Sequence, residues 1–257
     1  MGVKKIYNFS AGPAALPREV ELALQEAIID YKGTGISVGS IGHRTELFAE
    51  IAEQSEARLR RLLAISDDYA VLFLHGGASH QFAMVPMNLL RGKQTTDYFL
   101  TGTWSQKAYK EAQRYCDVNI VGDIHKTTEG LIHLPEQQDW QLNPEAAYVY
   151  YTPNETIHGL EFHTVPETGR VPLVADATST LLSRPLDVNQ HGLIFAGAQK
   201  NLGIAGVTIV IVRRDLLGQE LKHTPTLYSY LHHDQERSLS NTGPVCLGIR
   251  RILSCNG

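Results

Sequence analysis

Seven short apolar segments, several of them separated by helical stretches, constrain the fold of this 257-residue chain more than any other feature. Their lengths are typical of strands. The strands predicted from them are residues 70–74, 97–101, 118–121, 146–151, 171–175, 193–195 and 207–212. Residues 17–32 and 45–64 carry apolar side chains at helical spacing. Strands that alternate with helices predict an α/β protein with a layered sheet in one organised domain.

Composition predicts a globular protein and argues against several kinds of partner. Hydrophobic residues make up 43% of the chain and charged residues 19%, and the length is sufficient for one large core. The formal net charge of −4, with acids and bases interspersed, argues against nucleic acid. An apolar run of about eighteen residues and a signal-peptide pattern are both missing, so we expect no membrane contact.

The cysteines and histidines indicate neither disulfides nor a metal. Cys116, Cys246 and Cys255 have neither disulfide-framework nor zinc spacing, which favours a reducing cytoplasm. The histidines show no comparable ligand spacing, so no metal site is expected.

Two polar residues stand at the ends of predicted strands. Asp176 ends one apolar run, and Lys200 follows the next in the sequence Ala-Gly-Ala-Gln-Lys. Ligands of open α/β sheets bind at the carboxyl ends of the strands. A lysine that forms a Schiff base and an aspartate that keeps the ring nitrogen protonated are what pyridoxal phosphate (PLP) requires. The pair alone is equally compatible with charged residues at the solvated ends of ordinary strands.

The segment His75-Gly-Gly-Ala-Ser-His-Gln81 connects a predicted strand to an apolar helical run. Small residues in such a place let backbone N–H groups surround an anion, which the helix dipole favours. One interpretation is a phosphate site formed by the amides of Ala78 and Ser79 and the Ser79 hydroxyl. The other is a plain turn with Ser79 as the helix N-cap. The glycine patterns of nucleotide-binding loops are missing, which argues against a nucleotide-binding module.

Five segments, in the same order along the chain, resemble those of the phosphoserine aminotransferase family of fold-type I PLP enzymes. They are Asn8-Phe-Ser-Ala-Gly-Pro-Ala-Ala-Leu-Pro17, Gly42-His-Arg44, Thr101-Gly-Thr-Trp104, Asn154-Glu-Thr156 and Ala196-Gly-Ala-Gln-Lys-Asn201. The resemblance implies an N-terminal arm in residues 1–15 and a PLP-binding large domain in residues 16–244. That domain would hold a mostly parallel seven-stranded sheet flanked by helices in three α/β/α layers. Residues 245–257 match nothing, and the family's C-terminal small domain is expected to be absent.

The resemblance also implies roles around the cofactor ring. Lys200 would hold PLP and, once released, carry the transferred proton. Asp176 would pair with the ring nitrogen, Trp104 would stack on the ring, and Thr156 would bind the side of the phenolic oxygen. Asn154 and Glu155 are interpreted as structural residues that position the loop.

Further roles implied by the resemblance concern phosphate and substrate. The cofactor phosphate would be bound by Ala78, Ser79 and Gln199, together with Asn241 and Thr242 of a partner subunit. Shared sites of this kind imply a homodimer. His43 and Arg44 would contact substrate, and an arginine suits a planar anion because its guanidinium binds as a bidentate fork.

The implied reaction moves an amino group between L-glutamate and 3-phosphohydroxypyruvate, giving 2-oxoglutarate and O-phospho-L-serine in serine biosynthesis. Some relatives also act in pyridoxine biosynthesis. The alternative is a truncated PLP-binding homologue with weak or no catalysis, since in the family the C-terminal domain covers the site and supplies an arginine for the substrate carboxylate. A cysteine desulfurase is a further alternative, but Cys246 and Cys255 lie in the unmatched tail.

Overall fold

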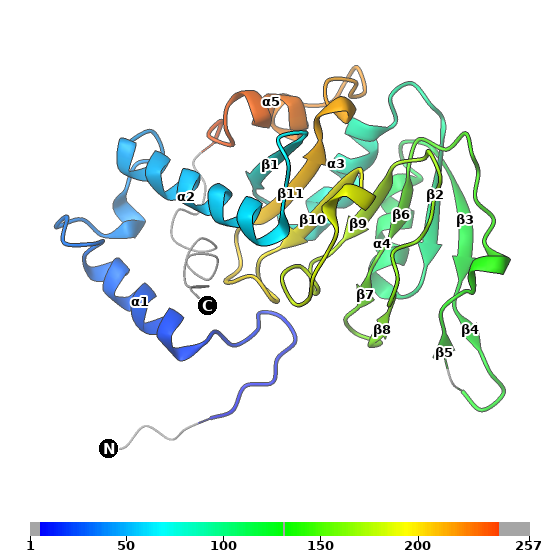
Figure 1. Ribbon diagram of the computed structural model, residues 1–257, viewed down its shortest axis with the longest axis horizontal. Coiled ribbons are helices and arrows are strands. Elements are labelled where there is room, and N and C mark those ends of the chain that lie inside the picture. The colour runs from blue at the N-terminus through cyan, green and yellow to red at the C-terminus, as the bar shows by residue number, and fades with distance from the viewer. Residues whose placement is uncertain (1–5, 131, 242–257) are drawn as a thin grey trace.

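The computed structural model describes residues 6–130 and 132–241, and a seven-stranded sheet forms its centre (Figure 1). In spatial order the strands are β1 (Tyr69–Leu74), β11 (Thr208–Arg213), β10 (Leu193–Gly197), β9 (Leu173–Asp176), β6 (Val149–Tyr151), β2 (Thr95–Leu100) and β3 (Asp117–Asp123). Strand β11 runs antiparallel to both of its neighbours, and the other neighbouring pairs are parallel. The predicted α/β class and mostly parallel seven-stranded sheet are therefore confirmed.

Strand β6 begins three residues later than predicted, at Val149 rather than Ala146. The backbone N–H of Val149 donates to the carbonyl of Pro172 at 2.9 Å, at the point where the pairing with β9 begins. Proline has no N–H to donate, so the ladder does not extend past it. Residues 146–148 are nevertheless fully buried, which explains why their apolar character resembled that of a strand.

Three helices cover one face of the sheet. Helices α3 (Gly77–Leu89) and α4 (Thr103–Ala112) pack against each other and against the strands, and α5 (Tyr230–Gln235) lies beside β1 (Figure 1). Their buried side chains meet alternate strand residues, such as Tyr98 and Phe195, in one apolar cluster. This layer brings the N-terminal ends of α3 and α4 close to the carboxyl ends of the strands that precede them.

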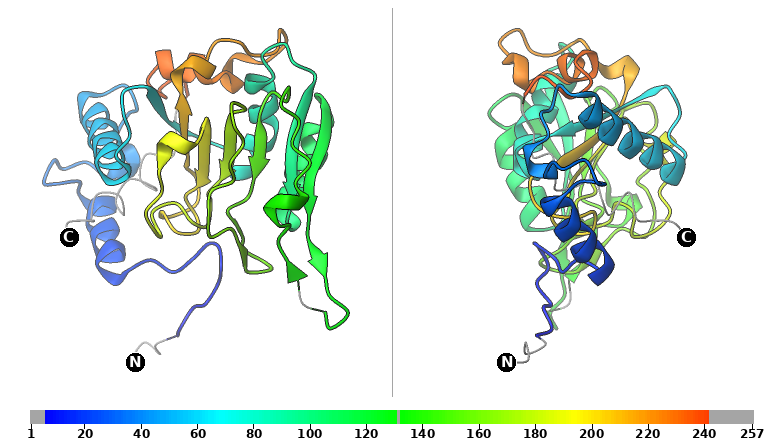
Figure 2. Two further views of the ribbon diagram at one scale, coloured as in Figure 1. Left: turned by 45° about the vertical axis from the view of Figure 1, so that its right-hand side comes forward. Right: turned by 90° about the vertical axis from the view of Figure 1, so that its left-hand side faces the viewer.

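The opposite face is covered by α2 (Glu46–Leu63) and by irregular segments. Thr45 caps this helix by accepting a hydrogen bond from the N–H of Phe48 at 3.3 Å, and Leu59 and Leu63 near its end join the core on this face. Helix α1 (Arg18–Ile29) packs with α2 through a separate smaller apolar cluster and stands to the side of the sheet (Figure 2). The second helical layer is thus thinner than the first.

Short elements complete the described chain. They are the 3₁₀ helices η1 (Val38–Ser40), η2 (Gln137–Asp139), η3 (Val188–Gln190), η4 (Arg214–Leu216) and η5 (Thr226–Tyr228), and the hairpins β4 (His125–Lys126) with β5 (Ile132–His133) and β7 (Asn154–Glu155) with β8 (Leu160–Glu161). The second hairpin directly follows β6 and carries one of the predicted site residues, Thr156, immediately after β7.

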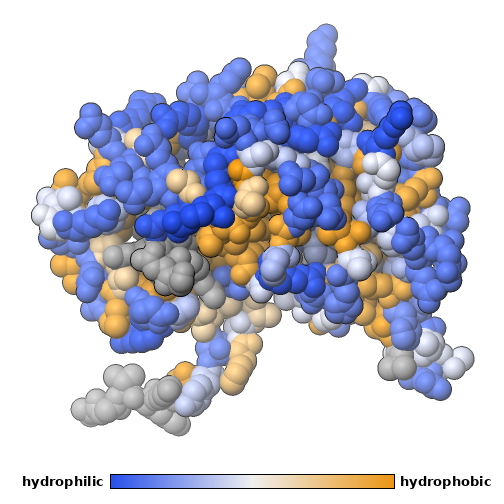
Figure 3. All heavy atoms as spheres, in the orientation of Figure 1, coloured by the Kyte–Doolittle hydropathy of each residue, from blue (hydrophilic) through white to orange (hydrophobic). Residues whose placement is uncertain are grey.

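The arm that precedes α1 returns to the body of the molecule beside Gln199 and Lys200. The backbone N–H of Ala14 donates to the carbonyl of Gln199 at 2.9 Å, just beyond β10. Further out, Ile6, Tyr7 and Phe9 are exposed, and the arm projects below the body of the molecule, whose surface on this side mixes hydrophilic and hydrophobic areas (Figure 3). Among the described residues, no helix combines the length and apolar character needed to span a membrane.

Candidate active site

Four of the predicted site residues converge at the carboxyl edge of the sheet. Lys200 follows β10, Asp176 ends β9, Thr156 follows β7, and Trp104 lies in the first turn of α4. The Lys200 ammonium nitrogen donates to Thr156 Oγ1 at 2.5 Å and lies 4.8 Å from the centroid of the Trp104 ring. The fold therefore assembles an amine, a hydroxyl and an aromatic ring from three separate segments of the chain.

Asp176 carries a buried carboxyl group, and one of its oxygens is held by Thr178. Asp176 is 4% exposed. Its Oδ1 accepts hydrogen bonds from the Thr178 hydroxyl at 2.5 Å and from the Thr178 N–H at 3.1 Å. Burial raises the pKa of Asp176 from 3.8 to about 6, although the Thr178 hydrogen bonds and the Lys200 charge oppose the shift. A cation that contacted this carboxylate would offset its burial.

Thr178 was not singled out from the sequence, and it does more than accompany Asp176. Its hydroxyl oxygen also accepts a hydrogen bond from the Gly197 N–H at 3.2 Å, at the end of β10. Thr178 therefore ties the end of the lysine-bearing strand to the carboxylate. The available sequence signal was its position two residues after an aspartate, where a side-chain-to-backbone turn is common.

The amine of Lys200 lies in a confined place. Burial lowers the pKa of Lys200, and the negative charges of Asp176 and Glu155 act to raise it. The arm crosses the lysine stem, since a Cβ added to Gly12 would lie 3.0 Å from Lys200 Cγ. The effect is a half-buried amine with a lowered pKa, which favours the neutral, nucleophilic form.

The turn between β1 and α3 has the features expected of an anion site. Gly76 has φ +85°, and a Cβ there would lie 1.8 Å from Nδ1 of His80, so only glycine fits. Ala78 and Ser79 lie in the first turn of α3, where backbone N–H groups lack partners within the helix. Gln199 lies at the same edge of the sheet, with its amide side chain folded against Gly197. A phosphate at this turn would receive N–H groups and the positive end of the α3 dipole.

Buried polar atoms without partners gather at the same edge. Among the described residues, these side-chain atoms include Thr101 Oγ1, Trp104 Nε1, Tyr150 OH, Thr152 Oγ1 and Thr208 Oγ1. Thr101 follows β2, Thr152 follows β6, and Thr208 begins the antiparallel β11. All three positions lie at the carboxyl edge of the parallel strands. Buried polar groups are normally paired, so this concentration indicates a place built for a polar ligand.

Other predicted site residues lie on loops or at the end of the described chain. Arg44 is exposed and His43 half-buried, both on the loop between η1 and α2, and no hydrogen bond or ion pair recorded for the described residues links Arg44 to Lys200. Asn241 is exposed at the end of the described chain, and Thr242 lies outside the described residues. No cluster of metal-binding side chains occurs in the part of the chain that the structure describes.

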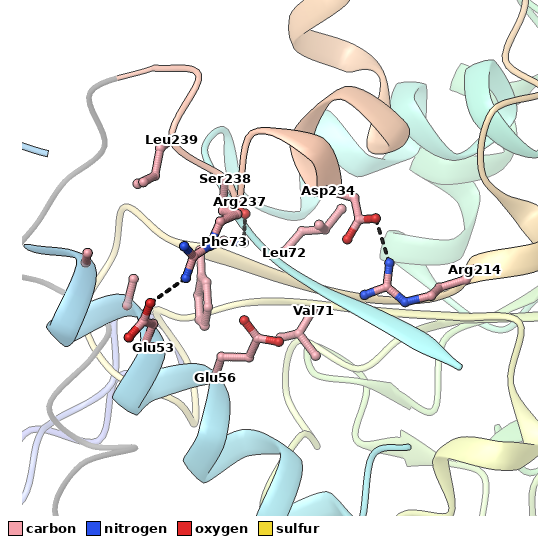
Figure 4. Close-up of a pocket in the computed structure, with 12 residues that line it drawn as sticks. Glu53, Glu56, Val71, Leu72, Phe73, Arg214, Asp234, Arg237, Ser238 and Leu239 are labelled. Atoms are coloured by element: carbon pink, nitrogen blue, oxygen red, sulfur yellow. Dashed lines mark hydrogen bonds and ion pairs between the residues drawn. The ribbon is translucent and has the colours of Figure 1, made fainter. Parts of the chain in front are cut away.

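A cavity of about 340 Å³ lies away from these residues, between α2, β1 and α5 (Figure 4). Its charged groups are already paired: Arg237 contacts Glu53 at 2.5 Å and Arg214 contacts Asp234 at 2.6 Å. None of the predicted site residues lines it. This cavity is therefore separate from the residues predicted to form the site.

Comparison with known proteins agrees with this geometry. The sequence pattern of the class-V aminotransferases matches residues 6–234, and the chain therefore belongs to the class-V aminotransferase family. Within it, the chain is 54% identical over 240 residues to phosphoserine aminotransferase of Laribacter hongkongensis and 48% identical over 242 residues to that of Legionella pneumophila strain Corby. The family resemblance seen in the sequence is confirmed.

Solved structures give the same result. Phosphoserine aminotransferase from Bacillus circulans subsp. alkalophilus superposes with a TM-score of 0.90 at 45% identity, covering 97% of this chain and 69% of its own. The PLP-bound enzyme from Trichomonas vaginalis superposes with a TM-score of 0.89 at 36% identity, covering 96% and 73%. The two curated relatives named above are matched over 93% and 94% of this chain, which spans 66% of the length of each.

Proposed function

We propose that this chain binds PLP at the carboxyl edge of its sheet and carries out PLP-dependent amino transfer. The observation that carries the proposal is the juxtaposition of a half-buried lysine amine with a buried carboxylate on the next strand. Asp176 ends β9 and Lys200 follows β10, the parallel neighbour of β9, and the two side chains lie within electrostatic range of each other. The unpartnered buried threonine hydroxyls support the presence of a polar ligand there.

The residues present fit PLP in each of its parts. When bound, PLP supplies an electrophilic carbonyl and a ring that withdraws electrons. Asp176 would hold the proton of the ring nitrogen, Trp104 would provide a face for the ring, and Thr156 would bind the phenolic oxygen. The phosphate would be bound by Ala78 and Ser79 at the α3 N-terminus and by Gln199.

Lys200 would have two tasks, and its surroundings suit both. A neutral amine is needed to hold the cofactor, and burial favours that form by lowering the pKa. Once released, the same amine would take a proton from the substrate α-carbon and deliver it to C4′ of the cofactor. A general base works best when its pKa lies near the operating pH. The ordinary pKa of a lysine lies well above neutral pH, so a downward shift brings it closer to that value.

The proposed substrates are L-glutamate and 3-phosphohydroxypyruvate, with O-phospho-L-serine and 2-oxoglutarate as products. The support is the identity of about half the aligned residues with phosphoserine aminotransferases. Arg44, with His43 beside it, would bind an anionic substrate group. A homodimer is proposed because Asn241 and Thr242 match residues that complete a partner's phosphate site in the family. A cytoplasmic location is supported by the scattered cysteines.

The experiment that tests the cofactor site is a PLP titration of the purified 257-residue chain. We expect a visible absorption band to appear, and borohydride to fix PLP covalently to Lys200, as shown by peptide mapping. Lys200→Ala should abolish both the band and the covalent label. Label on a different lysine, or no label, would refute the assignment.

The substrate assignment needs a separate measurement. L-glutamate should shift the visible band of the PLP-loaded chain and release 2-oxoglutarate, and 3-phosphohydroxypyruvate should restore the band and give O-phospho-L-serine. A band that responds to other amino acids but not to glutamate would leave PLP binding intact and refute the proposed substrates.

A further inference from the structure

Helix α4, which carries Trp104, begins without a capping side chain of its own. Its N-cap position is Gly102, and the first-turn N–H groups of a helix have no partner within the helix. The Ser105 hydroxyl binds the backbone N–H groups of Thr101 and Gly102, at 2.9 and 3.0 Å, and so fixes the chain just before the helix. The N–H groups of Trp104 and Ser105 remain to be satisfied.

Glu155, 51 residues further along the chain, supplies the missing acceptors. One side-chain oxygen accepts from the Trp104 N–H at 2.9 Å, and the other accepts from the Ser105 N–H at 2.8 Å. Glu155 is completely buried. Gly102 makes room for it, since a Cβ there would lie 2.7 Å from Glu155 Cδ. The carboxyl group therefore takes the place of an N-cap side chain and fixes the position of the tryptophan backbone.

The same residue also holds the loop that carries Thr156. Its backbone carbonyl accepts hydrogen bonds from the N–H groups of His158 and Gly159, at 3.0 and 2.8 Å. These bonds close the turn of the β7–β8 hairpin immediately after Thr156, whose hydroxyl contacts Lys200. Glu155 thus joins the two segments that contact the lysine amine, one through its side chain and one through its backbone.

We propose that Glu155 is a positioning residue that holds Trp104 against the cofactor site. The proposal rests on the proposed function, because the ring that Trp104 would contact belongs to PLP. Its consequence is that changing a residue with no predicted contact to the cofactor weakens cofactor binding through Trp104.

Glu155→Gln is the direct test. The amide oxygen can still accept one N–H, but the amide nitrogen then faces a second N–H donor, which leaves buried donors unpaired. A buried unpaired donor is expected to weaken PLP binding roughly ten- to hundredfold. Glu161→Gln is the matched control, because Glu161 lies opposite Asn154 in the same hairpin and contacts Arg184 rather than α4.

Two measurements distinguish positioning from general stability. The loss in PLP affinity caused by Glu155→Gln should shrink to about twofold in a Trp104→Ala background, because that background has no ring left for Glu155 to position. In a Trp140→Phe background, where Trp104 is the remaining tryptophan, Glu155→Gln should make the fluorescence of the PLP-free protein more accessible to acrylamide. The second measurement needs no bound cofactor.

Gly102→Ala provides an independent perturbation if Glu155→Gln does not fold, because the added methyl displaces the same carboxylate without removing it. It should reproduce the weaker PLP binding and the greater acrylamide quenching. Parent-like affinity and quenching in the Glu155 variant would overturn the proposal. An equal loss of PLP affinity with and without Trp104 would also overturn it. If only Gly102→Ala folds, parent-like affinity and quenching in that variant would overturn the proposal. Failure of the parent to bind PLP refutes the proposed function instead, and the quenching result then decides the role of Glu155.

Discussion

Replacing Asp176 with asparagine should remove a pH dependence from the unfolding free energy of the PLP-free protein. Burial raises the folded-state pKa of this carboxyl to about 6, from 3.8. The folded state therefore holds its proton at pH values where the unfolded state has released it. Stability contributed by the protonated form is present at low pH and is lost as the pH rises through this window.

The size of the effect follows from the shift. The pKa shift from 3.8 to about 6 corresponds to about 3 kcal/mol of unfolding free energy. About 1.4 kcal/mol of this is lost between about pH 5 and about pH 7.5. Asparagine does not titrate, so the difference in unfolding free energy between parent and Asp176→Asn should change by that amount over this interval. Other titrating groups cancel in the difference.

The assay is urea unfolding of parent and variant across this pH range, followed by circular dichroism. Thr178→Val should move the midpoint of the effect to higher pH, because the Thr178 hydrogen bonds lower the pKa of Asp176. Saturating PLP should flatten the parent's dependence, since a protonated ring nitrogen favours the ionised carboxylate. An identical pH dependence in parent and Asp176→Asn would refute the assignment of this titration to Asp176.

Two further predictions concern the phosphate turn and a buried histidine. Gly76→Ala should lower the unfolding free energy by about 1–2 kcal/mol from its positive φ alone, and further because the new Cβ meets the His80 ring; urea unfolding measures this. Gly92→Ala is the control, with a similar φ and no neighbour in contact, and equal losses would contradict the steric argument. Burial lowers the pKa of His191 to about 4 from 6.5, so the parent should lose about 2 kcal/mol of unfolding free energy between neutral pH and about pH 5, as the unfolded state takes up the proton first. His191→Gln should remove this loss, and an unchanged pH dependence in the variant would contradict the prediction.

Local patterns were sufficient to locate the strands of the sheet and to mark two candidate cofactor residues. The seven strands were predicted with most of their residues, because alternation and short apolar runs reflect burial that each segment undergoes separately. Lys200 and Asp176 stand at the ends of such runs, where ligands bind in sheets of this kind, and the family resemblance then favoured a PLP site over ordinary charged strand ends. Trp104 and Thr156 came from the family resemblance rather than from their spacing.

The arrangement of these elements depended on contacts between distant residues. That β11 lies between β1 and β10, antiparallel to both, is a matter of pairing between segments far apart in the chain. The support of the site is equally non-local: Glu155 caps α4 across 51 residues, and Thr178 links Asp176 to the end of β10. The sequence by itself therefore determined the strands and the candidate residues at their ends, because strand periodicity and residue type are local properties. The tertiary structure alone decided how they are held, because a buried hydrogen bond forms only once the fold has brought donor and acceptor together.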